Sequence, residues 1–194
     1  MRTFDLFIVK LDKQLDDKIT TPGGLELFID TKFNEFENRI QEGPVVASPF
    51  KHDTGVEVGD TLYFHHLVVL NEGQVLTGEP NHYTVRFDPE HTINNQAIAY
   101  KDQHTGDIHP LAGWSLLEPV EEEKVQESDT IEVVKFSEVP VTKGRVAFSA
   151  PWIEEIGAEV GDVVGFRKNM DYRVNIDGKE YYRTRAEDLM YVEV

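Results

Sequence analysis

Histidine is the residue type that most plausibly brings chemistry to this sequence. All seven histidines lie between His52 and His109, and His65 is adjacent to His66. Imidazole is a common ligand of zinc, copper and nickel, so a metal-binding barrel is one conceivable function. However, the spacings include neither His-Glu-x-x-His nor His-x-His, and adjacent side chains on a strand point to opposite faces of a sheet. We therefore expect surface or interface histidines and no metal site.

Nucleophilic and nucleotide chemistry lacks its usual motifs. The chain has no cysteine, which excludes disulfides, thiolate metal sites and cysteine nucleophiles. None of the five serines lies in a Gly-x-Ser-x-Gly elbow, and no Gly-x-x-x-x-Gly-Lys-Ser/Thr phosphate loop is present. We expect no catalytic residues and no cofactor, so the protein is predicted to bind partners and not to act as an enzyme.

Charge and hydropathy exclude further classes of partner. The 194 residues include 19 Lys and Arg against 36 Asp and Glu, a formal net charge of −17. Such an acidic surface repels phosphate backbones, so no nucleic-acid partner is expected. The longest aliphatic run, Leu67–Leu70, is far shorter than the roughly 20 residues that span a bilayer. The N-terminus also lacks the pattern of a secretory signal, and we expect a cytoplasmic protein without a membrane partner.

The elements that position these residues are predicted to be strands throughout. Short runs rich in Val, Ile, Phe and Tyr alternate with Gly, Asp, Asn and Pro, which is typical of an all-β fold. Thr61–Leu70 is one such run. Asp177-Gly178 lies between two others and predicts a hairpin with a type I′ turn.

An internal repeat organises the strands. Gly43–Ser48 is echoed by Gly144–Ser149, and Val56–Phe64 is echoed by Ala158–Phe166. The members of the two pairs lie 101 and 102 residues apart. Two blocks in the same order at nearly the same offset predict a duplicated β unit.

The repeat predicts two units, residues 1–118 and residues 119–194. In this division Trp114–Glu118 is the strand that closes the first unit. Whether Trp114–Val120 is a linker or a strand shared by both units stays open at this point.

The first unit is predicted to be the larger one. From the glycine of Val-Gly-Asp to the glycine of the following hairpin there are 47 residues in the first unit (Gly59 to Gly106) but 17 in the second (Gly161 to Gly178). We therefore expect a His-rich insertion of about 30 residues within residues 70–104 of the first unit.

The order of several short motifs resembles the GroES-like co-chaperonins, the small lids of the bacterial chaperonin folding chamber. The matching stretches are, in chain order, Phe7–Lys10, Pro22–Leu27, Gly43–Val46, Val58–Asp60, Ile176–Tyr182 and Glu187–Glu193. They cover most of both units. The resemblance implies a tandem of two GroES-like β-barrels, of which the second lacks a Gly-Gly-hydrophobic segment between Glu123 and Lys143.

The resemblance also implies a partner-binding segment at residues 16–41, similar to the mobile loop of the family. Its candidate binding residues are Gly23, Gly24, Leu25, Glu26, Leu27 and Phe28. Glu26 stands where the family has an apolar residue, but on an extended chain it points away from Leu25 and Leu27. The alternative is that Leu25–Ile29 forms another strand of the first barrel, with Gly23-Gly24 as its turn.

The function implied by the resemblance is that of a co-chaperonin. Such a protein forms a ring-shaped homo-oligomer, caps a chaperonin ring, encloses an unfolded protein substrate and slows the ATP turnover of its partner. The alternative is a GroES-like binding or structural module that has lost chaperonin docking.

Overall fold

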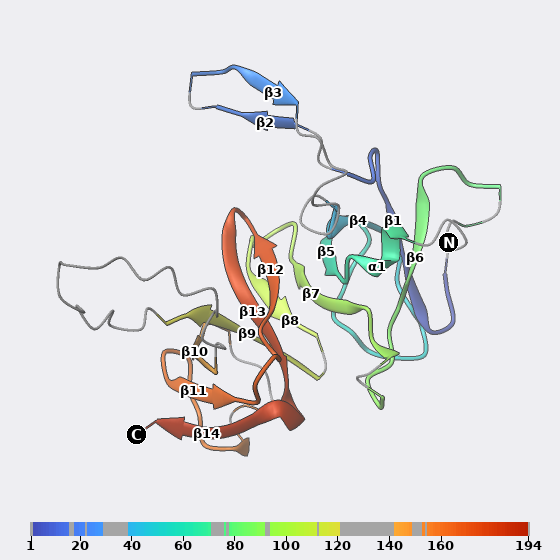
Figure 1. Cartoon of the computed structure of the whole chain (residues 1–194). Coiled ribbons are helices and arrows are strands. Elements are labelled where there is room, and N and C mark those ends of the chain that lie inside the picture. The colour runs from blue at the N-terminus through green and yellow to red at the C-terminus, as the bar shows by residue number, and fades with distance from the viewer. Residues whose placement is uncertain are drawn as a thin grey trace. The chain divides into compact units, whose positions relative to one another are not determined.

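The computed structural model divides the chain into two compact units, Met1–Ala112 and Gly113–Val194 (Figure 1). It describes residues 2–15, 18–21, 23–28, 39–70, 76, 78–91, 94–111, 113–120, 142–148, 153 and 155–193. Each unit contains one antiparallel sheet of six strands, as the all-β prediction requires. In the part of the chain that is described, no helix has the length and hydropathy of a membrane-spanning segment.

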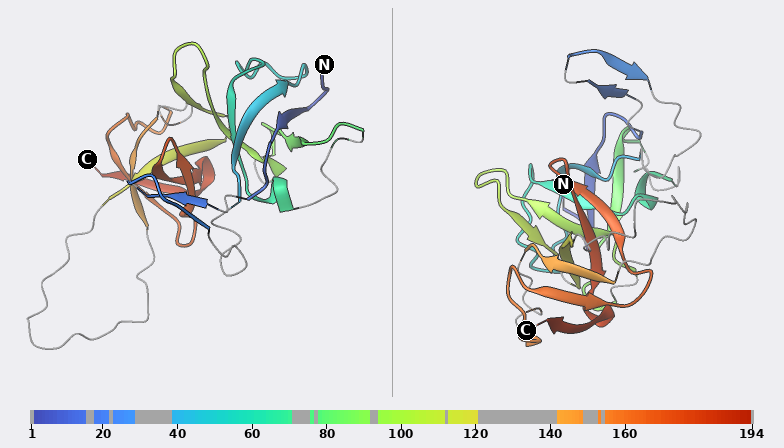
Figure 2. Two further views of the ribbon diagram at one scale, coloured as in Figure 1. Left: turned by 90° about the horizontal axis from the view of Figure 1, so that it is seen from above. Right: turned by 60° about the vertical axis from the view of Figure 1, so that its left-hand side comes forward.

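The sheet of the first unit has the strand order β6-β1-β4-β5-β7-β8 (Figures 1 and 2). Its strands are β1 (Leu6–Lys10), β4 (Glu42–Ala47), β5 (Thr61–Phe64), β6 (His82–Arg86), β7 (Ala97–Lys101) and β8 (Ile108–Pro110). Alternate residues of β4 and β6 are buried, as expected for strands with one face on a core. That core includes Phe7, Val9, Val45, Leu62, Phe64 and Val85.

The sheet of the second unit has the order β12-β13-β9-β10-β11-β14. Its strands are β9 (Trp114–Pro119), β10 (Lys143–Val146), β11 (Val163–Phe166), β12 (Tyr172–Ile176), β13 (Lys179–Arg185) and β14 (Leu189–Glu193), with a 3-10 turn, η3 (Ala186–Asp188), before the last. Asp177 and Gly178 have positive φ angles of 52° and 79° between β12 and β13. The predicted hairpin is confirmed, because a type I′ turn needs positive φ at both central residues.

The repeated Val-Gly-Asp blocks form the same turn in both units. Gly59 and Gly161 have φ angles of 104° and 101°, a conformation that glycine adopts with little strain. The aspartate that follows accepts a hydrogen bond on Oδ2 from the backbone N–H three residues before it, at 2.8 Å for Asp60 and 2.9 Å for Asp162. The two blocks that are similar in sequence therefore form the same turn with the same side-chain hydrogen bond.

The ladders repeat as well. Gly43 pairs with Leu62 in the first unit as Gly144 pairs with Val164 in the second. A register shift follows Tyr63 where β5 meets β7, and the same shift follows Gly165 where β11 meets β14. The order β6-β1-β4-β5-β7 thus matches β13-β9-β10-β11-β14. The sixth strand differs, because β8 lies beyond β7 whereas β12 lies at the opposite edge, beyond β13.

The prediction that Trp114–Glu118 closes the first unit is wrong. Strand β9 pairs with β10 and β13, both in the second unit. Its apolar residues gave no indication of which sheet it joins, because pairing is fixed by strands distant in sequence. The strand is therefore neither a linker nor a closing strand of the first unit; it opens the second.

The predicted insertion of about 30 residues is also wrong, because it equated two unrelated hairpins. The turn at Gly106 joins β7 to β8, whereas Gly178 joins β12 to β13. At the register shift between β5 and β7, Phe64 pairs with Ala97, and the two residues lie 33 positions apart in the chain. The equivalent pair at the shift between β11 and β14 is Phe166 and Leu189, which lie 23 positions apart. The connection from β5 to β7 is therefore only ten residues longer than its counterpart from β11 to β14.

The strand predicted over Thr61–Leu70 ends at Phe64 and gives way to a helical turn, α1 (Leu67–Leu70). The His65 side chain explains the change, since its Nδ1 accepts a hydrogen bond from the N–H of Leu67 at 3.1 Å. The backbone oxygen of His65 also accepts a bond from Val68 N–H at 3.0 Å. A local side-chain bond of this kind competes with the ladder.

Candidate functional site

The predicted partner-binding segment forms a β-hairpin between β1 and β4. Strands β2 (Lys18–Thr20) and β3 (Glu26–Phe28) pair antiparallel in a two-stranded sheet of their own. Figure 1 shows them side by side, and among the described residues they form a sheet of two strands. The alternative prediction is right about a strand that follows a turn at Gly23-Gly24, but in the described ladders this strand pairs with β2 and not with the sheet of the first unit. Residues 16, 17, 22 and 29–38 of the predicted segment 16–41 lie outside the described residues.

The turn of the hairpin is held by Thr21. The Gly24 N–H donates to Thr21 O at 2.8 Å and the Thr21 N–H donates to Leu25 O at 2.9 Å. The Leu25 N–H also donates to Thr21 Oγ1 at 3.1 Å. Gly24 has a φ of +80°, and a Cβ placed there meets nothing within 4 Å. The turn therefore needs glycine at this position for its backbone conformation and not for space.

The hairpin exposes large apolar side chains. Leu25, Leu27 and Phe28 are 61%, 47% and 75% exposed, and Gly23 and Glu26 are exposed as well. Three large apolar residues within four positions form an exposed patch of the kind that binding surfaces use, because covering apolar surface releases it from water. The structure thus brings all six predicted binding residues to one exposed hairpin.

The two faces of the hairpin differ in chemistry. Lys18 lies opposite Phe28 in the register, and Glu26 is two residues before Phe28 on β3, so these three side chains share one face. Leu27 lies on the other face because side chains alternate along a strand. The Lys18 Nζ is 3.1 Å from Glu26 Oε2 and 5.1 Å from the centroid of the Phe28 ring. The alternation along β3 agrees with the prediction that Glu26 points away from Leu27, whereas Leu25 lies before the strand, in the turn.

Two residues that hold the hairpin, Lys18 and Thr21, were missed by the sequence analysis. Their roles depend on the pairing register, which local composition does not give. A usable signal was present in the Lys-Ile-Thr run before Gly-Gly and the Glu-Leu-Phe run after it. Two short runs that carry opposite charges around a glycine turn are typical of a hairpin with a cross-strand ion pair.

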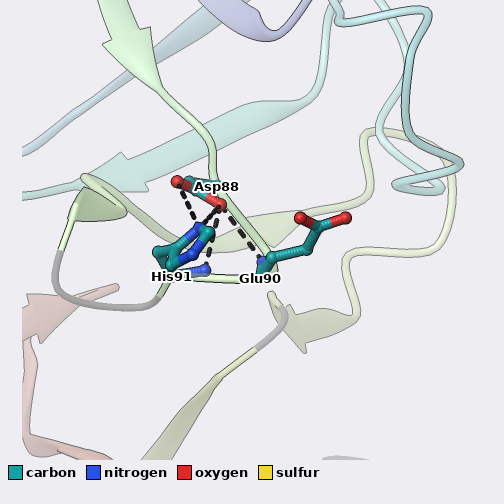
Figure 3. A network of polar contacts seen from close by, with 3 residues as sticks. All are labelled: Asp88, Glu90 and His91. Carbon is teal, nitrogen blue, oxygen red and sulfur yellow. Dashed lines mark hydrogen bonds and ion pairs between the residues drawn. The ribbon is translucent and has the colours of Figure 1, made fainter.

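The histidines lie apart from the hairpin. A cleft of about 530 Å³ on the first unit is lined by His52 and His91, together with charged residues that include Asp88. The Oδ1 of Asp88 accepts hydrogen bonds from Glu90 N–H at 3.2 Å and His91 N–H at 3.0 Å, and lies 3.3 Å from His91 Nδ1 (Figure 3). Desolvation raises the pKa of Asp88, but these bonds outweigh it and hold the pKa below its usual value.

Other histidines take local structural roles. His82 Nδ1 lies 2.9 Å from Pro80 O, and the ring of His109 stacks on Tyr100. The rings of His65 and His66 lie 4.3 Å apart, so the expectation that they face opposite sides is wrong, because the strand ends before them. Within the described ranges, no group of three His, Asp or Glu side chains is placed to hold a metal ion.

No known protein family has a model that matches this chain, and no curated protein matches its sequence. Its function must therefore be inferred from the exposed hairpin, from the duplicated units and from the order of the motifs.

Proposed function

We propose that this protein is co-chaperonin-like, binding and capping a chaperonin ring to assist ATP-dependent protein folding. The observation that carries the proposal is the exposure of Leu25, Leu27 and Phe28 on a hairpin of its own. In the chain, the hairpin lies between β1 and β4, the first two strands of the first unit's six-stranded sheet. The mobile loop has the same place in the motif order that resembles the GroES-like family.

The proposed architecture is a tandem of two GroES-like barrels, assembled into a ring-shaped homo-oligomer. Support comes from the matching strand orders of the two units and from their shared Val-Gly-Asp turns. Each copy contributes one hairpin. Because linked contacts raise overall affinity far beyond that of one contact, a ring of hairpins binds tightly while each hairpin still releases easily.

The proposal is tested by replacing the exposed leucines. The purified protein should slow the ATPase of its cognate chaperonin and support refolding of a substrate that needs an enclosed chamber. Leu25→Ser combined with Leu27→Ser should abolish both effects and leave the melting temperature unchanged, because both side chains are exposed in the free protein. Val58→Ser, which removes another exposed apolar side chain, is the matched control and should retain full activity.

The alternative function is a GroES-like binding or structural module that has lost chaperonin docking. Glu26 is the observation in its favour, because a carboxylate in a docking segment is costly to bury. The unmodified protein distinguishes the two functions. Absence of any effect on the ATPase and refolding by the cognate chaperonin overturns the co-chaperonin function and leaves the binding module.

A further inference from the structure

The hairpin has a second face, on which a charged pair lies beside Phe28. Lys18, Glu26 and Phe28 lie on this face, and the leucines of the docking segment lie on the other or in the turn. A group that enters an apolar groove must be stripped of water, which favours Leu25 and Leu27 over the charged pair. The Lys18–Glu26 pair therefore stays in solvent when the leucine face docks.

The hairpin is small enough for weak interactions to decide whether it is folded. Two-stranded hairpins are at best marginally stable in water, and the described residues of β3 are all exposed, so no core supports them. Its ordering therefore depends on the turn at Thr21 and on contacts across the two strands. Besides the backbone ladder, the described side-chain contacts between β2 and β3 include the Lys18–Glu26 ion pair at 3.1 Å and the Lys18–Phe28 ring contact at 5.1 Å.

Both partners of the pair are partly exposed, with side chains 44% and 58% accessible for Lys18 and Glu26. An ion pair in such a setting has a modest effect and is weakened by salt. A modest effect is sufficient here, because a hairpin near its folding midpoint responds to small changes in free energy. The contribution then multiplies over all hairpins that a ring engages at once.

We propose that Lys18 and Glu26 form a clasp that keeps the hairpin folded before docking, so that Glu26 is a positioning residue for the leucine face. This inference rests on the proposed function for its docking step, whereas the clasp itself is a property of the free protein. It explains the carboxylate at position 26. The charge faces away from the partner, and the ion pair lowers the free-energy cost of ordering the hairpin on binding.

Two measurements test the clasp. In the free protein, hydrogen exchange at the Thr21 amide, which donates to Leu25 O, reports the folded hairpin. Glu26→Gln should accelerate this exchange roughly two- to fivefold, as expected for a surface pair. The charge swap Lys18→Glu with Glu26→Lys should restore protection, and added salt should reduce the difference between the unmodified protein and Glu26→Gln. Glu79 is also exposed but lies outside the hairpin. Glu79→Gln makes the same change from carboxylate to carboxamide, so it is the matched control and should leave exchange at Thr21 unchanged.

Binding to the cognate chaperonin supplies the second readout. Glu26→Gln should weaken binding and the charge swap should recover it. Unchanged exchange at Thr21 in Glu26→Gln overturns the clasp, and altered exchange with unchanged affinity overturns its role in docking. If the unmodified protein does not bind at all, the proposed function and the docking role fail together, and the exchange measurement still decides whether the clasp exists.

Discussion

The guanidinium carbon of Arg183 lies 4.1 Å from the ring centroids of both Trp114 and Tyr172. Such stacking is favourable for a cation, yet Arg183 is only 8% exposed and its Nε and Nη1 have no hydrogen-bond partner among the described residues. Desolvation lowers its pKa to about 10, with a smaller opposing effect from Tyr172 and a further lowering by Arg185. The contacts with the two rings thus stabilise the Arg183 side chain, whereas the loss of its hydration is unfavourable.

A neutral side chain of similar length should be tolerated better at this position. We expect Arg183→Met to raise the free energy of unfolding by about 1 kcal/mol, because a well-packed apolar side chain often replaces a buried charge with a gain. Urea unfolding at pH 7 measures this. Arg183→Ala, which also loses the stacking area, should destabilise the protein. A clear loss of stability in Arg183→Met contradicts the prediction and means that the guanidinium has partners in solution.

The same residue predicts a direction for the pH dependence. A guanidinium whose pKa is lower in the folded than in the unfolded protein binds protons more weakly in the folded state. The unfolded state then holds more protons between about pH 10 and the higher ordinary pKa of an arginine side chain, so this residue's contribution to stability rises with pH across that window. At neutral pH the full unfavourable contribution is present, which is why the methionine variant is best compared there.

At the scale of elements, the repeated turn offers a comparison within one chain. Gly59 and Gly161 share nearly the same φ, but a Cβ at Gly59 meets the Gln103 side chain at 2.5 Å, whereas at Gly161 it meets nothing within 4 Å. We expect Gly161→Ala to destabilise by about 1–2 kcal/mol from backbone strain alone. Gly59→Ala should cost more, because the displaced Gln103 also loses its 3.0 Å bond to Val58 O.

Thermal or urea unfolding of the two alanine variants checks the comparison. Equal losses in both variants mean that Gln103 moves aside freely, and a larger loss in Gly161→Ala contradicts the assignment of strain. Gln103→Ala provides the control, since it should remove most of the difference between the two positions by removing the side chain that the new Cβ meets.

The elements also show which parts of the fold the sequence could predict. The Val-Gly-Asp turns and the Asp177-Gly178 hairpin were predictable because glycine and aspartate encode turn geometry locally. The partners of Trp114–Pro119 were not, because β9 pairs with β10 and β13 from far along the chain. The helical turn at Leu67–Leu70 was missed because its apolar residues suit a strand equally well, and a bond from Leu67 N–H to the His65 side chain decided the outcome.

The candidate site was predicted in part for the same reason. The glycines and apolar residues of positions 23–28 are visible in the sequence as an unusual group. Their pairing with Lys18–Thr20 depends on a register that is set across the turn. The sequence could therefore indicate the candidate binding residues, but not that they lie on a hairpin with two chemically different faces.

At the scale of the whole molecule, the two units differ at one sheet edge, and this predicts which edge the proposed ring would use. In the described ladders β7 has β8 on its outer side, but its counterpart β14 has a neighbour on one side only, β11. Met190 and Tyr191 on β14 are 64% and 46% exposed, and an unprotected edge strand favours pairing with another chain.

If the proposed ring forms, we expect it to use the β14 edge. Met190→Lys combined with Tyr191→Lys should shift the protein from oligomer to single chains, because two added charges on an edge strand oppose strand pairing. Sedimentation velocity measures the change in mass. Phe50→Lys, at another exposed apolar position, should leave the assembly intact. If the oligomer persists in the double variant, the contact between copies lies elsewhere. If the unmodified protein is a single chain, the proposed ring does not exist, and the avidity on which tight capping depends has no structural basis.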